Sequence, residues 1–165
     1  ELNQLFNSMD PSPFHDRDLD RDAEEFIASW AAEHPRQNDL KLVVHLAKAP
    51  ADVARPALVV SDAISHYFDY RATMTRHELK RLLREGRAAF FVGLVFLALC
   101  LFGANALADT TGWRAIAGEG LLIVGWVAMW KPLEIALYLW WPLVSQGRLY
   151  RRLARMPVEV IVAEA

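Results

Sequence analysis

The chain has 165 residues, of which 54% are hydrophobic and 23% are charged, and its formal net charge is -2. This balance excludes a nucleic-acid-binding protein as the main class, because no basic patch interleaved with aromatic residues occurs outside two short membrane-proximal clusters. The only cysteine, Cys100, excludes an intrachain disulfide.

Residues 1–17 are mostly polar and contain Pro11 and Pro13, so we expect an extended arm. Because the sequence starts at Glu1 rather than at Met, we also expect residues upstream of it. Alternate aspartates at the end of the arm resemble the start of a calcium loop: Asp16, Asp18, Asp20 and Asp22. Arg21 stands where the turn glycine of such a loop belongs, so we expect no metal there.

Residues 18–87 are expected to form a small lobe of helix, strand and helix. Asp16, Asp18 and Asp20 are candidate caps for a helix over Leu19–Glu33. Its predicted apolar face consists of Leu19, Ala23, Phe26, Ile27, Trp30 and Ala31. Alternation over Leu40–Leu46 predicts a strand, and Val158–Val162 near the end of the chain has the same character. We expect the two strands to pair, with the helix covering one face.

Pro56 can occupy the first turn of a helix, and no strong breaker follows before Gly86. The helix is therefore expected to run on as a stalk into the apolar segment that follows. Three residues with metal-ligand spacing share one of its faces: Asp62, His66 and Asp69. No further ligand has a known position, so a solvated helix face is the favoured interpretation and no metal site is predicted.

Two apolar segments predict transmembrane helices. Residues 88–108 contain no charge and are long enough to cross a hydrocarbon core of roughly 30 Å. Residues 115–144 form the second predicted span, after a short loop at residues 109–114, and residues 145–165 form a basic segment that ends in the terminal strand. The sequence thus predicts a mainly α membrane protein, with a two-helix transmembrane hairpin and a small α/β cytoplasmic lobe.

Clusters of basic residues flank the hairpin on one side, whereas the connection carries one residue of each sign, Asp109 and Arg114. The first group is Lys80, Arg81, Arg84 and Arg87, and the second is Arg148, Arg151, Arg152 and Arg155. By the positive-inside rule, both termini are predicted to face the cytoplasm of a bacterial cell, with the hairpin in its inner membrane.

Lys131 and Glu134 interrupt the second apolar segment on either side of Pro132. If the span starts near Glu119, Lys131 lies roughly 18 Å along the helix and well inside the hydrocarbon. A charge there is costly, so Lys131 and Glu134 are expected to pair and to face protein or water. Pro132 predicts a kink, because it lacks a backbone N–H group.

Three roles remain open for this segment, which begins at Trp130. The ion pair can be structural and fix packing against another subunit. Alternatively, Pro132 starts a helix that lies partly at the membrane interface, with Trp140 and Trp141 in the aromatic belt. The third role is a proton or ion relay. Five residues are predicted to anchor the chain at the membrane interface: Trp140, Trp141, Arg148, Arg151 and Arg152.

The second segment resembles a group of uncharacterised small bacterial proteins with two membrane spans. The resemblance lies in a Trp-x-Pro-Leu-Glu pattern followed by Trp-Trp-Pro: Trp130, Pro132, Leu133, Glu134, Trp140, Trp141 and Pro142. It covers the second span only and implies no activity.

No phosphate loop, nucleophile elbow or paired Cys-x-x-Cys motif is present, so neither catalysis nor a cofactor is predicted. The expected partners are the lipid bilayer and other membrane-protein subunits, and the first functional hypothesis is a non-catalytic accessory or scaffold subunit of a larger inner-membrane complex. The alternative is a homo-oligomeric channel or transporter component that uses Lys131 and Glu134.

Overall fold

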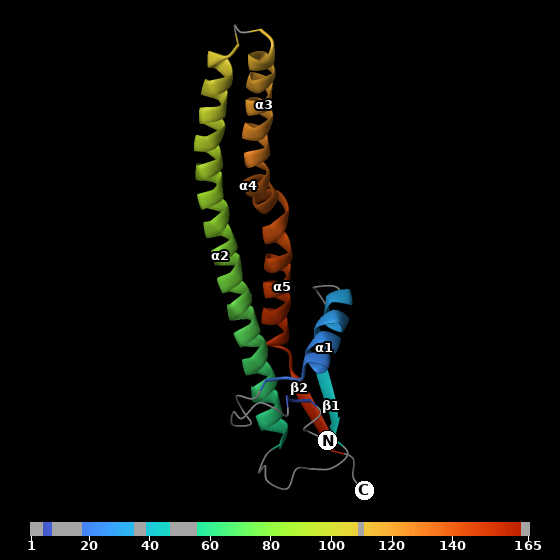
Figure 1. The fold of residues 1–165 in the computed structure, drawn as a ribbon. Helices are drawn as coiled ribbons and strands as arrows, with labels where there is room; N and C mark the ends of the chain where they lie inside the picture. Colours follow the sequence, from blue (N-terminus) through green and yellow to red (C-terminus); the bar gives the residue numbers. More distant parts are fainter. Residues whose placement is uncertain (1–4, 8–17, 35–38, 47–55, 109–110, 163–165) are drawn as a thin grey trace. The chain divides into compact units, whose positions relative to one another are not determined.

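The computed structural model describes residues 5–7, 18–34, 39–46, 56–108 and 111–162. These residues are mostly helical, and they include one pair of short strands (Figure 1). The chain divides into two compact units. Unit 1 consists of Glu1–Thr75 and Ser145–Ala165, and unit 2 consists of Arg76–Val144.

Helix α1 of unit 1 spans Arg21–Glu33. Asp20 is its N-cap, and the Asp20 Oδ1 atom accepts a hydrogen bond of 3.0 Å from the backbone N–H of Asp22. This confirms one of the three candidate caps, because an N-cap carboxylate satisfies a backbone donor that the first helical turn leaves unpaired. Asp16 lies outside the described residues.

The apolar face of α1 is narrower than predicted. Ile27 and Ala31 are buried, whereas the side chains of Phe26 and Trp30 are exposed to 71% and 46%. The three- and four-residue spacing identified the correct helix, but only its Ile27–Ala31 side reaches the core of unit 1.

Strands β1 (Leu42–Leu46) and β2 (Val158–Val162) pair in parallel, with Leu42 opposite Val158. The predicted pairing is therefore confirmed. Leu42 and Val44 of β1 and Val158 and Val160 of β2 pack against the core of unit 1. On the other face, Lys41 forms an ion pair with Glu159. The strands alternate between core and solvent, as the sequence pattern indicated.

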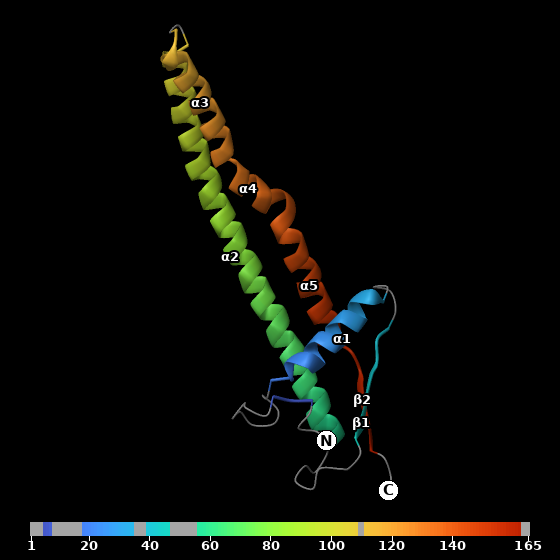
Figure 2. The same cartoon turned by 45° about the vertical axis from the view of Figure 1, so that its right-hand side comes forward.

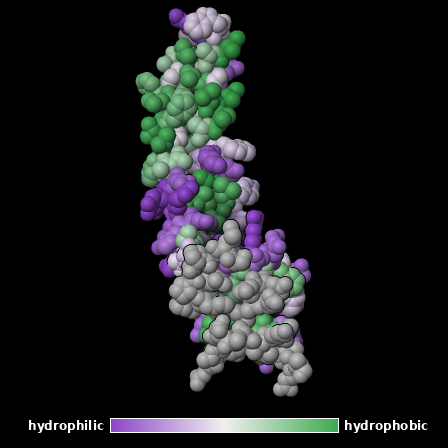
Figure 3. All heavy atoms as spheres, turned by 60° about the horizontal axis from the view of Figure 1, so that its bottom comes forward, coloured by the Kyte–Doolittle hydropathy of each residue, from purple (hydrophilic) through white to green (hydrophobic). Residues whose placement is uncertain are grey.

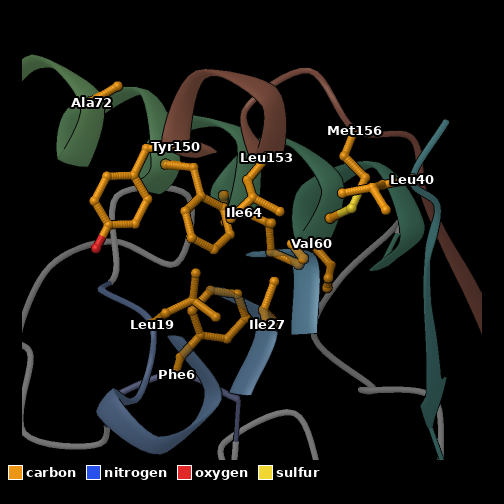
Figure 4. Close-up of a cluster of buried hydrophobic side chains, with 13 residues drawn as sticks. Phe6, Leu19, Ile27, Leu40, Val60, Ile64, Ala72, Tyr150, Leu153 and Met156 are labelled. Carbon is orange, nitrogen blue, oxygen red and sulfur yellow. The ribbon is translucent and has the colours of Figure 1, made fainter. Parts of the chain in front are cut away.

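The core of unit 1 is built mainly from side chains of three helices (Figure 4). Helix α2 (Pro56–Ala106) contributes Val60, Ile64, Phe68 and Ala72, and helix α5 (Trp140–Leu153) contributes Tyr150 and Leu153. Phe6, which is 1% exposed, also belongs to the core, and its backbone bridges to that of Leu19. The polar composition of residues 1–17 gave no reason to expect a core residue there.

Helix α2 spans Pro56–Ala106 without interruption, as the absence of breakers predicted. Its first part belongs to unit 1, and the rest belongs to unit 2. Within unit 2, α3 (Trp113–Ala128) returns antiparallel beside α2, and both views show the two helices side by side (Figures 1 and 2). Gly112, with φ of 74°, adopts the positive-φ conformation that glycine tolerates and precedes α3.

The returning helix is irregular around Pro132, where a kink was predicted. Helix α3 ends at Ala128, a short helix α4 (Trp130–Glu134) follows, and the five residues Ile135–Leu139 form a single π-helical turn before α5. Since Pro132 has no backbone N–H group, it cannot donate a hydrogen bond to the carbonyl oxygen of Ala128. The regular series of helical hydrogen bonds is therefore interrupted there. The irregular segment continues through the π-helical turn to Leu139, although a proline by itself removes only one helical hydrogen bond.

Candidate functional site

The surface of unit 2 is covered by large apolar side chains. In the most apolar stretch of α2 only 17% of the residues are buried, and in that of the returning helix 22% are buried. Both helices are long and apolar enough to cross a membrane. Figure 3 shows the apolar side chains gathered over the hairpin. The core helix of a soluble protein would bury such a surface.

Glycines mark where α2 and α3 approach each other. A Cβ atom at Gly125 would lie 2.9 Å from the Leu97 Cδ1 atom and 3.0 Å from the Cys100 Cβ atom. A Cβ atom at Gly93 would lie 3.2 Å from the carbonyl oxygen of Ala128. Small residues at such contacts let helices pack closely in the absence of a hydrophobic driving force between them.

Lys131 and Glu134 form the expected ion pair, with 3.0 Å between the Lys131 Nζ and Glu134 Oε2 atoms. Both side chains are exposed, Lys131 to 66% and Glu134 to 40%. An exposed pair of this kind contributes little to the stability of an isolated helix. Its position on the surface of the hairpin leaves it available to lipid headgroups, water or another protein.

The returning helix does not start near Glu119, the position from which the depth of Lys131 was predicted. Helix α3 begins earlier, at Trp113, which places Lys131 about 27 Å along the helix rather than 18 Å. The packing of the hairpin agrees, because Gly93 of α2 lies against Met129 and Gly86 lies against Ile135. Lys131 and Glu134 are therefore level with the first residues of the apolar part of α2.

The other predicted anchors lie on the same returning helix. Trp141 is 69% exposed, and Trp140 donates a hydrogen bond of 2.8 Å from its Nε1 atom to the carbonyl oxygen of Ala136, within the π-helical turn. Arg148, Arg151 and Arg152 lie on the part of α5 that belongs to unit 1, where they line a cavity.

The carboxylate of Glu24 lies at the centre of a polar network in unit 1. It accepts hydrogen bonds from the Tyr67 hydroxyl at 2.6 Å, from the Arg71 Nε atom at 2.7 Å and from the Tyr150 hydroxyl at 3.0 Å. Tyr150 also accepts hydrogen bonds from Arg71 and from Gln146, both at 3.2 Å. The Glu24 network thereby joins α1, α2 and α5.

The network shifts two pKa values. Partial burial and the hydrogen bond to Glu24 raise the pKa of Tyr67 well above its usual range. Burial alone would lower the pKa of Arg71, but the hydrogen bond to Tyr150 and the interaction with Glu24 outweigh it and raise the pKa. In Figure 4 the Tyr150 ring lies at the edge of the core, with its hydroxyl pointing away from the labelled apolar side chains. The network therefore favours a charged Arg71 and a neutral Tyr67.

Asp62, His66 and Asp69 are all exposed on α2. Among the residues that the structure describes, no group of three or more His, Cys, Asp or Glu side chains could hold a metal ion. Glu24 is the functional residue that sequence reasoning missed. The only signal was a helical arrangement of Tyr67 and Arg71, which cannot identify a partner more than forty positions away.

No family model, curated protein or solved structure matches the chain.

Proposed function

We propose that the chain is a non-catalytic accessory or scaffold subunit of a bacterial inner-membrane complex. In this proposal the hairpin of unit 2 is embedded in the bilayer, and unit 1 lies on the cytoplasmic side. The observation that carries the proposal is the exposure of large apolar side chains over both helices of the hairpin. Such a surface is stable only against lipid or another apolar surface.

The position of Lys131 and Glu134 along the hairpin supports a defined depth of the hairpin in the membrane. Trp113 and Lys131 are separated by about 27 Å of helix, close to the hydrocarbon thickness of roughly 30 Å. Lys131 and Glu134 would then lie at the inner boundary, where Lys side chains reach the headgroups. At this boundary the exposed ion pair would fix packing against another subunit, and Trp141 would lie in the aromatic belt.

The orientation follows from the distribution of positive charge. Lys80, Arg81, Arg84 and Arg87 precede the apolar part of α2, and four arginines follow the return of the chain, whereas only Arg114 lies near the connection. The positive-inside rule therefore puts both termini in the cytoplasm.

The polar groups of unit 1 support a structural role. Glu24 is 13% exposed and uses its carboxylate to hold three helices, so it is not presented to a substrate. The exposed Phe26 and Trp30 on α1 offer large rigid side chains of the kind that interfaces use. We infer that unit 1 contacts the soluble part of the larger complex.

The proposal is tested by extracting the protein from its native membrane in mild detergent and measuring the mass and composition of the particle. Unlike subunits in fixed stoichiometry are expected. A ring of this chain alone would contradict the accessory role and would favour the homo-oligomeric channel.

A paired substitution tests the part played by the ion pair. Lys131→Ala with Glu134→Ala is expected to weaken assembly of the particle, whereas Arg81→Ala with Glu85→Ala, which removes another exposed ion pair, is the matched control. A double variant at Lys131 and Glu134 that assembles normally but loses ion flux in proteoliposomes would instead indicate a pore.

A further inference from the structure

Unit 1 contains a cavity of about 770 Å³ between the end of α5 and the segments that lead into β1 and β2. Four arginines line it: Arg148, Arg151, Arg152 and Arg155. The opposite wall includes Asp39, Leu40 and Met156. The proposed function uses these arginines only as positive charge on the cytoplasmic side and assigns no ligand to the cavity.

The arrangement of the arginines follows from the helix. Arg148, Arg151 and Arg152 are three and four positions apart on α5 and therefore share one face of the helix. Arg155 follows in the turn after the helix ends at Leu153. Tyr150 and Leu153 on the other face are 4% and 1% exposed and fix the rotation of α5 against the core. On the opposite wall, the Leu42 N–H donates a hydrogen bond of 3.0 Å to the carbonyl oxygen of Pro157. This bond joins the start of β1 to the residue before β2. The cavity is thus built on the folded core.

Arg148, Arg151 and Arg155 give the cavity an excess of positive charge. Among the residues that the structure describes, no carboxylate forms an ion pair with Arg148, Arg151 or Arg155, and Asp39 is the one acidic residue in the lining. Like charges three and four positions apart on a helix repel each other. Arg151 and Arg152 can be explained by the negative end of the helix dipole, but that effect does not require a cavity with a second wall.

We propose that the arginine cavity binds a phosphate group, as a phosphate monoester or diester. Guanidinium groups present paired N–H donors that match phosphate oxygens, and all four basic residues here are arginine rather than lysine. The volume lies within the range of ligand pockets and exceeds what a phosphate ion fills, so Leu40 and Met156 would contact the remainder of the ligand. The same chemistry occurs in phospholipid headgroups and in soluble phosphate compounds.

Two binding measurements on the full chain distinguish these sources. The first titrates inorganic phosphate into the detergent-solubilised protein and follows the heat of binding. The second incorporates the protein into phosphatidylcholine nanodiscs with or without phosphatidylglycerol and counts retained phosphatidylglycerol by mass spectrometry. The test variant is Arg148→Gln with Arg155→Gln, and the control is Arg81→Gln with Arg84→Gln, which removes the same charge outside the cavity.

We expect saturable binding in at least one measurement, weakened at least tenfold by the substitutions at Arg148 and Arg155 and less than twofold by those at Arg81 and Arg84. Binding of phosphate would identify a soluble ligand, and selective retention of phosphatidylglycerol without phosphate binding would identify a lipid headgroup. Absence of saturable binding in both, or an equal loss in the control variant, would overturn the proposal.

A second variant covers the case in which the glutamine variant does not fold. Arg148→Lys with Arg155→Lys keeps the charge but removes the paired donors, so it is expected to keep the helical circular dichroism and to bind several-fold more weakly than the wild type. Wild-type affinity in this lysine variant would contradict guanidinium recognition. Because the cavity lies within unit 1, this inference does not depend on the accessory role.

Discussion

Glu24 connects three helices through one carboxylate, and its acceptor capacity is used within unit 1. Tyr67 and Arg71 approach it from α2, and Tyr150 approaches it from α5. Hydrogen bonds to a charged group are stronger than neutral ones, and a buried group that loses its partner carries the cost of its desolvation. The attachment of α1 to the rest of unit 1 therefore depends strongly on this residue.

Replacing Glu24 with Gln should loosen α1, because the amide removes the negative charge and turns one acceptor into a donor. We expect a loss of about 1–3 kcal/mol in the free energy of opening of α1. Hydrogen exchange of the α1 amides, measured by mass spectrometry, reports this directly. Glu25→Gln is the matched control at an exposed neighbouring position and should change exchange little. Equal exchange in the two variants would show that the network does not hold α1.

Tyr67 should ionise only at a pH well above that of an ordinary tyrosine. Its pKa is raised in the folded state relative to the unfolded value of about 10, so the folded state retains the proton more strongly. The associated stability is fully present below pH 10 and is lost as the pH rises through the folded pKa. Ultraviolet titration of tyrosinate, with Tyr67→Phe as the reference, should show one hydroxyl that titrates late. A titration curve unchanged in shape by Tyr67→Phe would contradict this.

At the scale of the elements, close packing of α2 against α3 depends on Gly125, where no larger side chain fits without movement. Gly120 lies on the same helix, and a Cβ atom at that position would have nothing within 4 Å. The same substitution at either glycine changes the helix propensity equally. Only the substitution at Gly125 also affects the contact between the helices, so a comparison of the two variants isolates the effect of that contact.

Gly125→Leu should push the two helices apart, because even the first side-chain atom would meet Leu97 and Cys100. Gly120→Leu should leave the hairpin intact. Spin labels at Phe102 and Ile123, in a Cys100→Ala background, report the separation of α2 and α3 by electron–electron double resonance. A longer and broader distance distribution is expected for Gly125→Leu alone, and the same distribution in both variants would refute the contact.

Much of the element structure could be predicted from local patterns. Helix periodicity, the cap at Asp20, the alternation in β1 and the missing donor of Pro132 all act within a few residues, so the sequence displays them directly. Three features depend on contacts between distant segments, which no local pattern records. They are the parallel direction of the strand pair, the burial of Phe6 and the hydrogen-bond partners of Glu24.

At the scale of the whole molecule, one chain combines a polar unit with its own core and a hairpin whose surface is apolar. Unit 1 buries Phe68 and Ile64 completely, whereas the hairpin leaves Phe91 and Trp126 each 65% exposed. These two distributions of apolar surface suit two different solvents, water for unit 1 and lipid for the hairpin. Insertion of the hairpin with both ends on one side is therefore the central claim.

Cysteine accessibility in intact cells tests this claim most directly. In a Cys100→Ala background, single cysteines replace Thr111 in the connection, Ser61 on α2 or Gln146 on α5, and a membrane-impermeant maleimide is applied after the outer membrane is permeabilised. We predict labelling of the cysteine at position 111 in intact inner membranes, and labelling at positions 61 and 146 only after the inner membrane is disrupted. Equal labelling at all three positions before disruption would contradict a membrane-spanning hairpin.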